Sequence, residues 1–137
     1  MLRRVFADTF YWIALANQND SWYEKAKSIS QEFHPFQIIT TDEVVTEFMN
    51  YFGDRGPYLR AKAVQLVQSI LVNPSVEIIP QSRESFHAGF QLYQDRLDKG
   101  YSLTDCISMA CMHRQSLTQV LTHDHHFAQE GFELLLK

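Results

Sequence analysis

Four acidic residues stand where an α/β fold would bring them to one edge of its sheet: Asp8, Glu47, Asp105 and Asp124. Two of them come after short apolar runs that we predict to be strands. Asp8 directly follows residues 3–7, and Asp124 comes two positions after Thr122. Ligands of open α/β sheets bind beyond the carboxyl ends of the strands. We therefore expect both carboxylates at the ligand-binding edge.

The other two acids lie near the starts of predicted helices. Glu47 is in the second turn of a helix that leaves the second predicted strand, and Asp105 is in the first turn of a helix that leads into the fourth. A helix that leads into a parallel strand runs antiparallel to it, so its N-terminus lies at the edge where the strands end. Each acid alone has a structural explanation as a cap, turn or surface residue, but their joint position predicts one site.

Four carboxylates at one site repel one another unless they bind protons or cations. Two carboxylates about 5 Å apart repel by roughly 3 kcal/mol at an effective dielectric constant of about 20. Hard oxygen ligands favour Mg²⁺ or Mn²⁺, and such ions activate water and stabilise the leaving oxygen of a phosphodiester. We therefore predict a Mg²⁺ or Mn²⁺ site with catalytic acids, supported by the nearby hydroxyl groups of Thr9, Ser102, Thr104 and Thr122.

Short β-branched runs alternate with longer helical patterns, which predicts one α/β domain over residues 1–137. Helices between consecutive strands imply parallel pairing, and thus a three-layer α/β/α sandwich around a central parallel sheet of four to five strands. Strands are expected at residues 3–7, 36–40, 76–80, 119–122 and 132–136. Helices are expected at residues 10–17, 21–33, 40–52, from the 53–57 turn to about 72, 82–99 and 102–115.

Capping boxes predict where several helices begin, since a Ser or Thr N-cap is followed three residues later by an acid. Three pairs have this spacing: Ser21 with Glu24, Thr40 with Glu43, and Ser102 with Asp105. Glu43 is thereby explained as a capping residue. Glu47, one turn deeper, has no capping role and is the acid that we predict for the site.

The overall charge disfavours a protein that binds nucleic acid through bulk charge, because 12 basic residues face 16 acidic ones and the net charge is −4. It leaves open binding through metal ions and a local basic rim. The candidate phosphate contacts are Arg3, Arg4, Arg55, Arg96 and Lys99.

Three further features bear on the setting of the protein. No run of about 18 apolar residues could span a membrane. The apolar run at residues 5–16 is interrupted by Asp8 and lacks a cleavage site, so we expect a cytoplasmic protein rather than a secreted one. Cys106 and Cys111 lie five apart in a helical pattern, and we expect buried structural thiols.

Four motifs resemble those of the PIN-domain ribonucleases, and specifically the VapC toxins of type II toxin–antitoxin systems. They are VFADT at 5–9, TTDEVVTE at 40–47, YSLTDCISMA at 101–110 and LTHDHHF at 121–127. The resemblance covers nearly the whole chain, and its last two motifs are the most specific. One position departs from the family: Phe10 stands where Ser or Asn is frequent.

The resemblance implies a sheet in the order 3-2-1-4-5, with the first and fourth strands side by side. It also implies a Mg²⁺- or Mn²⁺-dependent endoribonuclease that cuts tRNA or ribosomal RNA, forms a homodimer and is neutralised by a small cognate antitoxin. Two other functions remain open at this stage. One is a non-catalytic PIN scaffold that binds RNA or protein, and the other is a carboxylate–metal phosphohydrolase.

The histidines around Asp124 raise the possibility of a zinc site. His123, His125 and His126 are nearly consecutive, however, and neighbouring loop residues cannot easily face one ion. We expect His126 to pack or hydrogen-bond within its loop, and the other two to face solvent. Another open alternative concerns the aromatic residues near the N-terminus, which either stack RNA bases or, as we expect, form core or a dimer interface: Phe10, Tyr11, Trp12, Trp22 and Tyr23.

Overall fold

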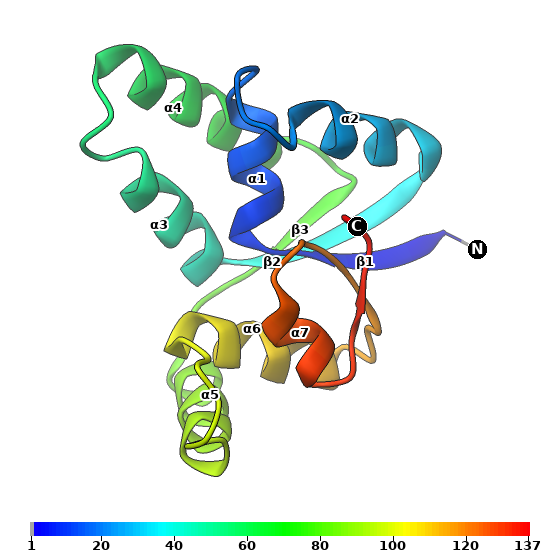
Figure 1. Ribbon diagram of the computed structural model, residues 1–137, viewed down its shortest axis with the longest axis vertical. Coiled ribbons are helices and arrows are strands. Elements are labelled where there is room, and N and C mark those ends of the chain that lie inside the picture. The colour runs from blue at the N-terminus through cyan, green and yellow to red at the C-terminus, as the bar shows by residue number, and fades with distance from the viewer. Residues whose placement is uncertain (1) are drawn as a thin grey trace.

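A parallel sheet organises the chain in the computed structural model, which describes residues 2–137 (Figure 1). Its five strands are β1 Arg3–Ala7, β2 Phe36–Thr41, β3 Val76–Ile79, β4 Gln119–Leu121 and β5 Glu133–Leu134. They are ordered β3-β2-β1-β4-β5, and every neighbouring pair is parallel. The predicted fold class and strand order are therefore confirmed. The order reverses at β1, which places the ends of β1 and β4 beside each other at a topological switch point.

Seven helices cover the two faces of the sheet. They are α1 Thr9–Ala16, α2 Tyr23–Glu32, α3 Asp42–Tyr51, α4 Pro57–Leu71, α5 Arg83–Asp95, α6 Leu103–Arg114 and α7 His125–Gln129. In Figure 1, α1 to α4 lie on one side of the strands and α5 to α7 on the other, with α5 outermost. Among residues 2–137, no helix combines the length and the apolar character that crossing a bilayer requires.

The start of α3 lies one residue later than the capping pattern predicts. Thr41, not Thr40, is the N-cap, and its hydroxyl accepts a hydrogen bond from the Val44 backbone N–H at 3.1 Å. Thr40 lies within β2, where it pairs with Ile78 of β3, and its hydroxyl donates to the Ala7 carbonyl at 2.9 Å. Glu43 therefore occupies the second helical position and closes no capping box. Its carboxylate instead accepts a 3.5 Å hydrogen bond from Ser85 on α5.

The capping-box pattern predicted one further helix start correctly and another wrongly. The box of Ser102 and Asp105 at α6 is present, with both reciprocal hydrogen bonds. The box predicted at Ser21 is wrong, because α2 begins after Trp22 and has no side-chain cap. There the Asp20 carboxylate accepts from the Trp22 backbone N–H at 2.8 Å, and this turn precedes the helix.

The core lies on both faces of the central strands, as expected for a parallel sheet that is covered by helices. Val5, Phe6 and Ala7 of β1 are fully buried, as are Val120 and Leu121 of β4. These strands hold the two Asp-bearing loops in fixed positions.

The packing of the core shows which of the aromatic and cysteine residues are buried and which are partly exposed. Tyr11 and Trp12 are buried on α1, whereas Phe10, Trp22 and Tyr23 stay partly exposed. Cys106 and Cys111 are buried free thiols, as predicted.

Gly89 allows α5 to pack closely against α6. It is buried in the middle of α5, where a β-carbon would lie only 2.9 Å from both the Cα and the backbone N of Ile107 on α6. Because those atoms are backbone, they cannot move aside as a flexible side chain could.

We predict that Gly89→Ala destabilises the protein, although the same change in an unhindered helix stabilises it by about 1 kcal/mol. Overpacking typically costs about 1 to 3 kcal/mol, so the free energy of unfolding in urea should fall. His87→Ala, at an exposed position of the same helix, is the control and should change it little. A rise in stability for Gly89→Ala would show that the helices can separate at no cost.

Candidate active site

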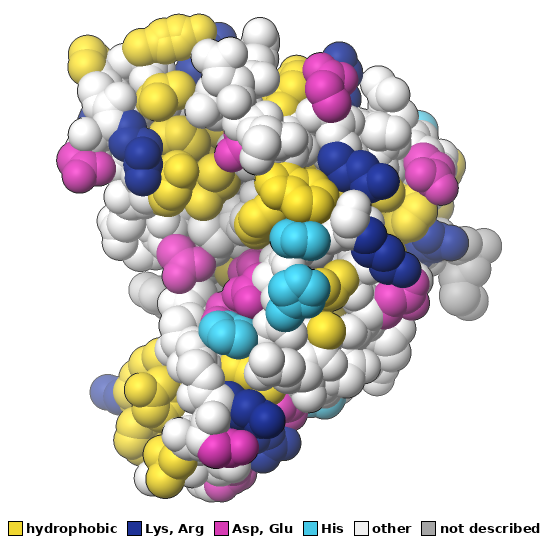
Figure 2. Space-filling model, viewed as in Figure 1, with side chains coloured by type: hydrophobic (Ala, Val, Ile, Leu, Met, Phe, Trp, Pro, Cys, Tyr) yellow, Lys and Arg dark blue, Asp and Glu magenta, His cyan; other side chains and the backbone are white. Residues whose placement is uncertain are grey.

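All four predicted acids line one open cavity of about 660 Å³ at the carboxyl edge of the sheet: Asp8, Glu47, Asp105 and Asp124. Acidic side chains gather beside histidines in a hollow of the surface (Figure 2). The acids come from the end of β1, from α3, from the start of α6 and from the loop after β4. The parallel sheet thus brings together residues that lie far apart in sequence.

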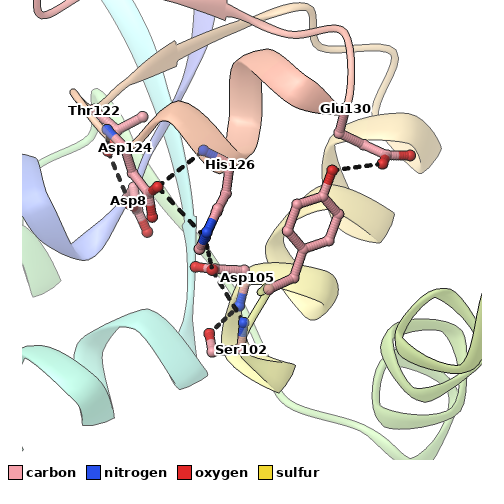
Figure 3. Close-up of polar contacts among 8 residues, drawn as sticks. Asp8, Ser102, Asp105, Thr122, Asp124, His126 and Glu130 are labelled. Carbon is pink, nitrogen blue, oxygen red and sulfur yellow. Dashed lines mark hydrogen bonds and ion pairs between the residues drawn. The ribbon is translucent and has the colours of Figure 1, made fainter. Parts of the chain in front are cut away.

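Asp8 forms part of the buried floor of this cavity. Its side chain accepts a 3.0 Å hydrogen bond from the hydroxyl of Thr122, and that hydroxyl accepts one from the Asp124 backbone N–H at 3.1 Å (Figure 3). Thr122 is fully buried and so connects the ends of β1 and β4. Burial, together with the charges of Asp105 and Glu47, raises the pKa of Asp8 to about 7, against hydrogen bonds from Thr9 and Thr122 that lower it.

Asp105 is oriented by the capping box at the start of α6. Its carboxylate accepts from the Ser102 backbone N–H at 3.2 Å, and the Ser102 hydroxyl accepts from the Asp105 backbone N–H at 3.0 Å. Burial raises the pKa of Asp105, as does the charge of Asp124, while the Ser102 N–H and His126 lower it. The cap leaves a carboxylate that is fixed but poorly solvated.

His126 connects Asp105 with Asp124 (Figure 3). Its Nδ1 atom lies 3.3 Å from a carboxylate oxygen of Asp105 and 3.5 Å from one of Asp124. The Asp124 carboxylate also caps α7 by accepting from the His126 backbone N–H at 3.0 Å. Ligand atoms of these three residues all lie within 4.8 Å of one another, close enough to share one ion.

Glu47 lies on the α3 side of the cavity, where the hydroxyl of Thr9 donates a hydrogen bond to its carboxylate. Thr9, Ser102 and Thr122 thus each hold one of the acids. The fourth supporting residue that we predicted, Thr104, lines a neighbouring smaller pocket together with Glu43 and Glu47. It makes no hydrogen bond to an acid of the cavity among the described residues.

The histidine loop partly departs from the sequence-based expectation. His126 hydrogen-bonds within its loop and His125 is exposed, as predicted. The prediction that His123 faces solvent is wrong, because its ring packs against Trp22 at 4.3 Å and its Nδ1 lies 2.9 Å from the Leu136 carbonyl. Of the three histidines, only His126 reaches the acids, which argues against a zinc site built from the histidine run.

A second polar network, formed by Tyr101, Arg96 and Glu130, lies next to His126. It was not predicted from the sequence. The hydroxyl of Tyr101 donates to the Glu130 carboxylate at 3.1 Å, and Arg96 binds the same carboxylate through two nitrogens at 2.9 and 3.0 Å. The ring centroid of Tyr101 lies 5.3 Å from that of His126. Arg96 holds the pKa of Glu130 below its usual range. No sequence motif links Arg96 to Glu130, because only the fold brings the C-terminal ends of α5 and α7 together.

The basic residues proposed as phosphate contacts are therefore not equivalent. Arg96 is committed to Glu130, and Arg3 and Arg4 lie at the end of β1 opposite to Asp8. Arg55 remains close to the cavity, because its guanidinium lies 3.9 Å over the ring of Tyr51, which lines it. The local basic rim that the sequence suggested is thus smaller than expected.

The donor set of the cavity suits a hard divalent cation. Its four acids supply carboxylate oxygens. Burial, together with the charges of neighbouring acids, raises the pKa values of Asp8 and Asp105, which indicates that their negative charges are poorly compensated. A bound cation would supply that compensation.

A model of the PIN-domain family matches residues 5–133. No curated protein sequence matches the chain. Its fold is similar to that of VapC20 from Mycobacterium tuberculosis, a toxin that cleaves the sarcin–ricin loop. The TM-score is 0.84 at 22% identity, over 93% of this chain and 95% of that one. It is also similar to VapBC2 from Rickettsia felis bound to promoter DNA, with a TM-score of 0.66 at 14% identity over 96% of each chain. A third similar structure is FitAcB from Neisseria gonorrhoeae, with a TM-score of 0.68 at 15% identity over 95% of each chain.

We predict that Asp8 makes the metal-free protein less stable as pH rises. Its folded pKa of about 7 lies above the ordinary value of 3.8, so the folded state holds this proton more tightly. The stabilisation is complete below about pH 4 and is lost as pH rises to about 7. Asp8→Asn should remove this loss and, at pH 8 in EDTA, be more stable than the parent by on the order of 1 to 4 kcal/mol.

Thermal melts of both proteins between pH 4 and pH 8 measure this effect. The exposed Asp54→Asn is the matched control and should keep the slope of the parent. Millimolar Mn²⁺ at pH 8 should raise the melting temperature of the parent more than that of Asp8→Asn, because a ligand stabilises the state that binds it. Parallel melting curves for parent and Asp8→Asn at all pH values would contradict the assignment.

Proposed function

The chain belongs to the PIN-domain family, and on that premise we propose that it is a metal-dependent endoribonuclease, the toxin of a toxin–antitoxin pair. The observation that carries the proposal is the meeting of Asp8, Glu47, Asp105 and Asp124 in one open cavity. The likeness of the fold to VapC20, which cleaves the sarcin–ricin loop, supports RNA as the substrate, with ribosomal RNA or tRNA as the expected class. With such substrates, we expect the activity in the cytoplasm.

We assign the same four acids as ligands of Mg²⁺ or Mn²⁺ and as the catalytic residues. When bound, such an ion supplies a Lewis acid for the phosphodiester and lowers the pKa of a water molecule. The protein supplies the arrangement of charge. Asp8 and Asp105 form the buried floor, fixed by Thr122 and by the cap of α6.

The remaining two acids are more exposed and face the open side of the cavity. Glu47 is held by the Thr9 hydroxyl, and Asp124 is held by the first turn of α7. Both are thus placed to meet a phosphodiester and the water that attacks it. Apolar side chains of Phe10 and Ile13 form part of the wall, which excludes bulk water from one side.

We further propose two protein partners. The first is a small antitoxin, supported by the likeness of the fold to the VapBC2 and FitAcB structures. The second is another copy of this chain. Large apolar side chains of the α5 segment are exposed at helical spacing: Phe86, Phe90, Tyr93 and Leu97. Hydrophobic side chains gather over the lower part of the molecule, where Figure 1 places α5 (Figure 2). An exposed apolar patch of this kind marks an interaction surface.

We predict that Phe90→Glu prevents self-association, because it places a charge in the middle of the proposed interface, where Phe90 stacks on Phe86 at 5.9 Å. Size-exclusion chromatography with light scattering should report a dimer for the parent and a monomer for the variant. Gln91→Glu introduces the same charge one position along α5 and should leave the dimer intact. We take roughly 100 µM as the largest dissociation constant of a transient dimer. A parent protein that is monomeric at that concentration would rule out this interface.

We predict that Glu47→Gln lowers kcat/KM for RNA by about 100-fold or more, because it keeps the shape of the side chain and removes its charge. The matched control is Glu43→Gln on the same helix. Glu43 contacts Ser85 and lies outside the acid cavity, so this variant should keep most of the activity. Both variants should retain the melting temperature of the parent within a few degrees.

The assay uses RNA, single-stranded DNA and a phosphomonoester, each with Mg²⁺, with Mn²⁺ and with EDTA. Cleavage of RNA alone, lost in EDTA, is the expected outcome. Hydrolysis of the phosphomonoester instead would indicate a phosphohydrolase. RNA binding without any cleavage would indicate a non-catalytic scaffold, and an inactive Glu43→Gln with an active Glu47→Gln would show that the acids are wrongly assigned.

A further inference from the structure

Four rings lie against one another beside the acid cavity, and we call them the ring cluster: Phe10, Trp22, His123 and His125. The closest pair is Trp22 and His123, whose centroids are 4.3 Å apart. Phe10 lies 5.5 Å from Trp22, and His125 lies 5.2 Å from His123. The rings come from the start of α1, from the turn before α2, from the loop between β4 and α7, and from the first residue of α7.

The ring cluster directly adjoins the acid cavity. Phe10 lines the acid cavity itself, and His123 and His125 are the chain neighbours of Asp124. In Figure 2 the histidines and a hydrophobic patch adjoin the acidic side chains, and lysine or arginine side chains lie on the same face, to the right of the histidines. A nucleic acid strand whose phosphate meets the acids would therefore place its next residue over the rings.

The ring cluster is both accessible and fixed. Phe10, Trp22 and His123 are half-buried, and His125 is exposed. The Nδ1 atom of His123 lies 2.9 Å from the Leu136 carbonyl, and the backbone N–H of Trp22 donates to the Asp20 carboxylate at 2.8 Å. The platform therefore exists before a ligand arrives, so that little side-chain entropy is lost on binding.

We propose that the ring cluster is a stacking platform for an unpaired RNA base next to the phosphodiester at the acids. The inference rests on the proposed nuclease function and names the substrate class as single-stranded or looped RNA. Stacking suits this chain, because its net charge is −4 and Arg96, one of the few basic residues near the site, is paired with Glu130. A base in a regular duplex is covered by its neighbours and cannot reach the rings.

Binding is tested without cleavage, in Mg²⁺, on the Glu47→Gln protein. The probes are a six-nucleotide oligoadenylate with a fluorescent 5′ label, the same strand with one abasic position, and a twelve-base-pair RNA duplex. Trp22 is a built-in reporter, because the second tryptophan, Trp12, is buried. The hexamer should quench tryptophan fluorescence, and anisotropy should show at least about tenfold weaker binding for Trp22→Ala in this background.

Two controls separate stacking from damage to the fold. Trp22→Phe keeps an aromatic ring and should restore most of the affinity, while Tyr58→Ala removes an exposed ring of α4 and should change nothing. The strand whose abasic position falls on the platform should bind the protein with Trp22 intact less well than the unmodified strand does. The two strands should bind Trp22→Ala equally well.

The outcomes distinguish this inference from the nuclease proposal. Binding that depends on Trp22, together with a parent protein (Glu47 intact) that cleaves no RNA in Mg²⁺ or Mn²⁺, would support the platform and contradict the nuclease. Two results would overturn the platform and leave the nuclease proposal intact. One is RNA cleavage by Trp22→Ala with the KM of the parent. The other is equal binding of the hexamer by the Glu47→Gln protein with and without Trp22→Ala. Duplex RNA that quenches as strongly as the hexamer would also overturn it.

Discussion

The mutual repulsion of four carboxylates at the end of the sheet is the constraint on which the rest of the site depends. Three of them lie at helix N-termini, because Asp8 and Asp124 are the N-caps of α1 and α7 and Asp105 is in the first turn of α6. The partial positive charge of a helix N-terminus stabilises a nearby anion, typically by about 0.3 to 1 kcal/mol. That gain does not offset the burial of Asp8, whose pKa still rises to about 7. The helix N-termini stabilise the carboxylates without offsetting their burial and repulsion, and a bound cation would supply the missing charge.

The hydrogen bonds around the acids show how a repulsive cluster is held in one geometry. Thr122 lies between Asp8 and Asp124, donating to one and accepting from the backbone of the other. His126 contacts Asp105 and Asp124, and its ring lies beside Tyr101 of the Glu130 network. Since α7 has only five residues, this packing, rather than helix propensity, keeps its first turn in place. Neutral hydroxyls such as that of Thr122, and the paired carboxylate of Glu130, thus hold the buried side of the site in place, while its open side stays acidic.

The sequence predicted features set by local pattern better than those set by contacts between distant segments. Asp8 and Asp124 could be placed because a strand end is visible in the apolar run before it, and Asp105 because its capping box is complete. Thr40 and Thr41 both fit an N-cap, and the contacts that distinguish them, the bond from Thr40 to Ala7 on the neighbouring strand and the cap of Thr41 on Val44, are visible only in the fold. The pairing of Arg96 with Glu130 and the packing of His123 on Trp22 likewise require the assembled fold.

An acidic protein with the RNA-cleaving function proposed here would have to obtain its binding energy from something other than bulk charge. The described residues offer two sources beside the same cavity. The acids on one side suit a divalent ion, which reverses the local sign of charge, and the rings around Trp22 offer contact with a base, which carries no charge. Phe10 belongs to both, since it lines the cavity and lies 5.5 Å from Trp22. Its presence where Ser or Asn is frequent in the family extends the aromatic surface to the edge of the acids, at the point where a strand would pass from one to the other.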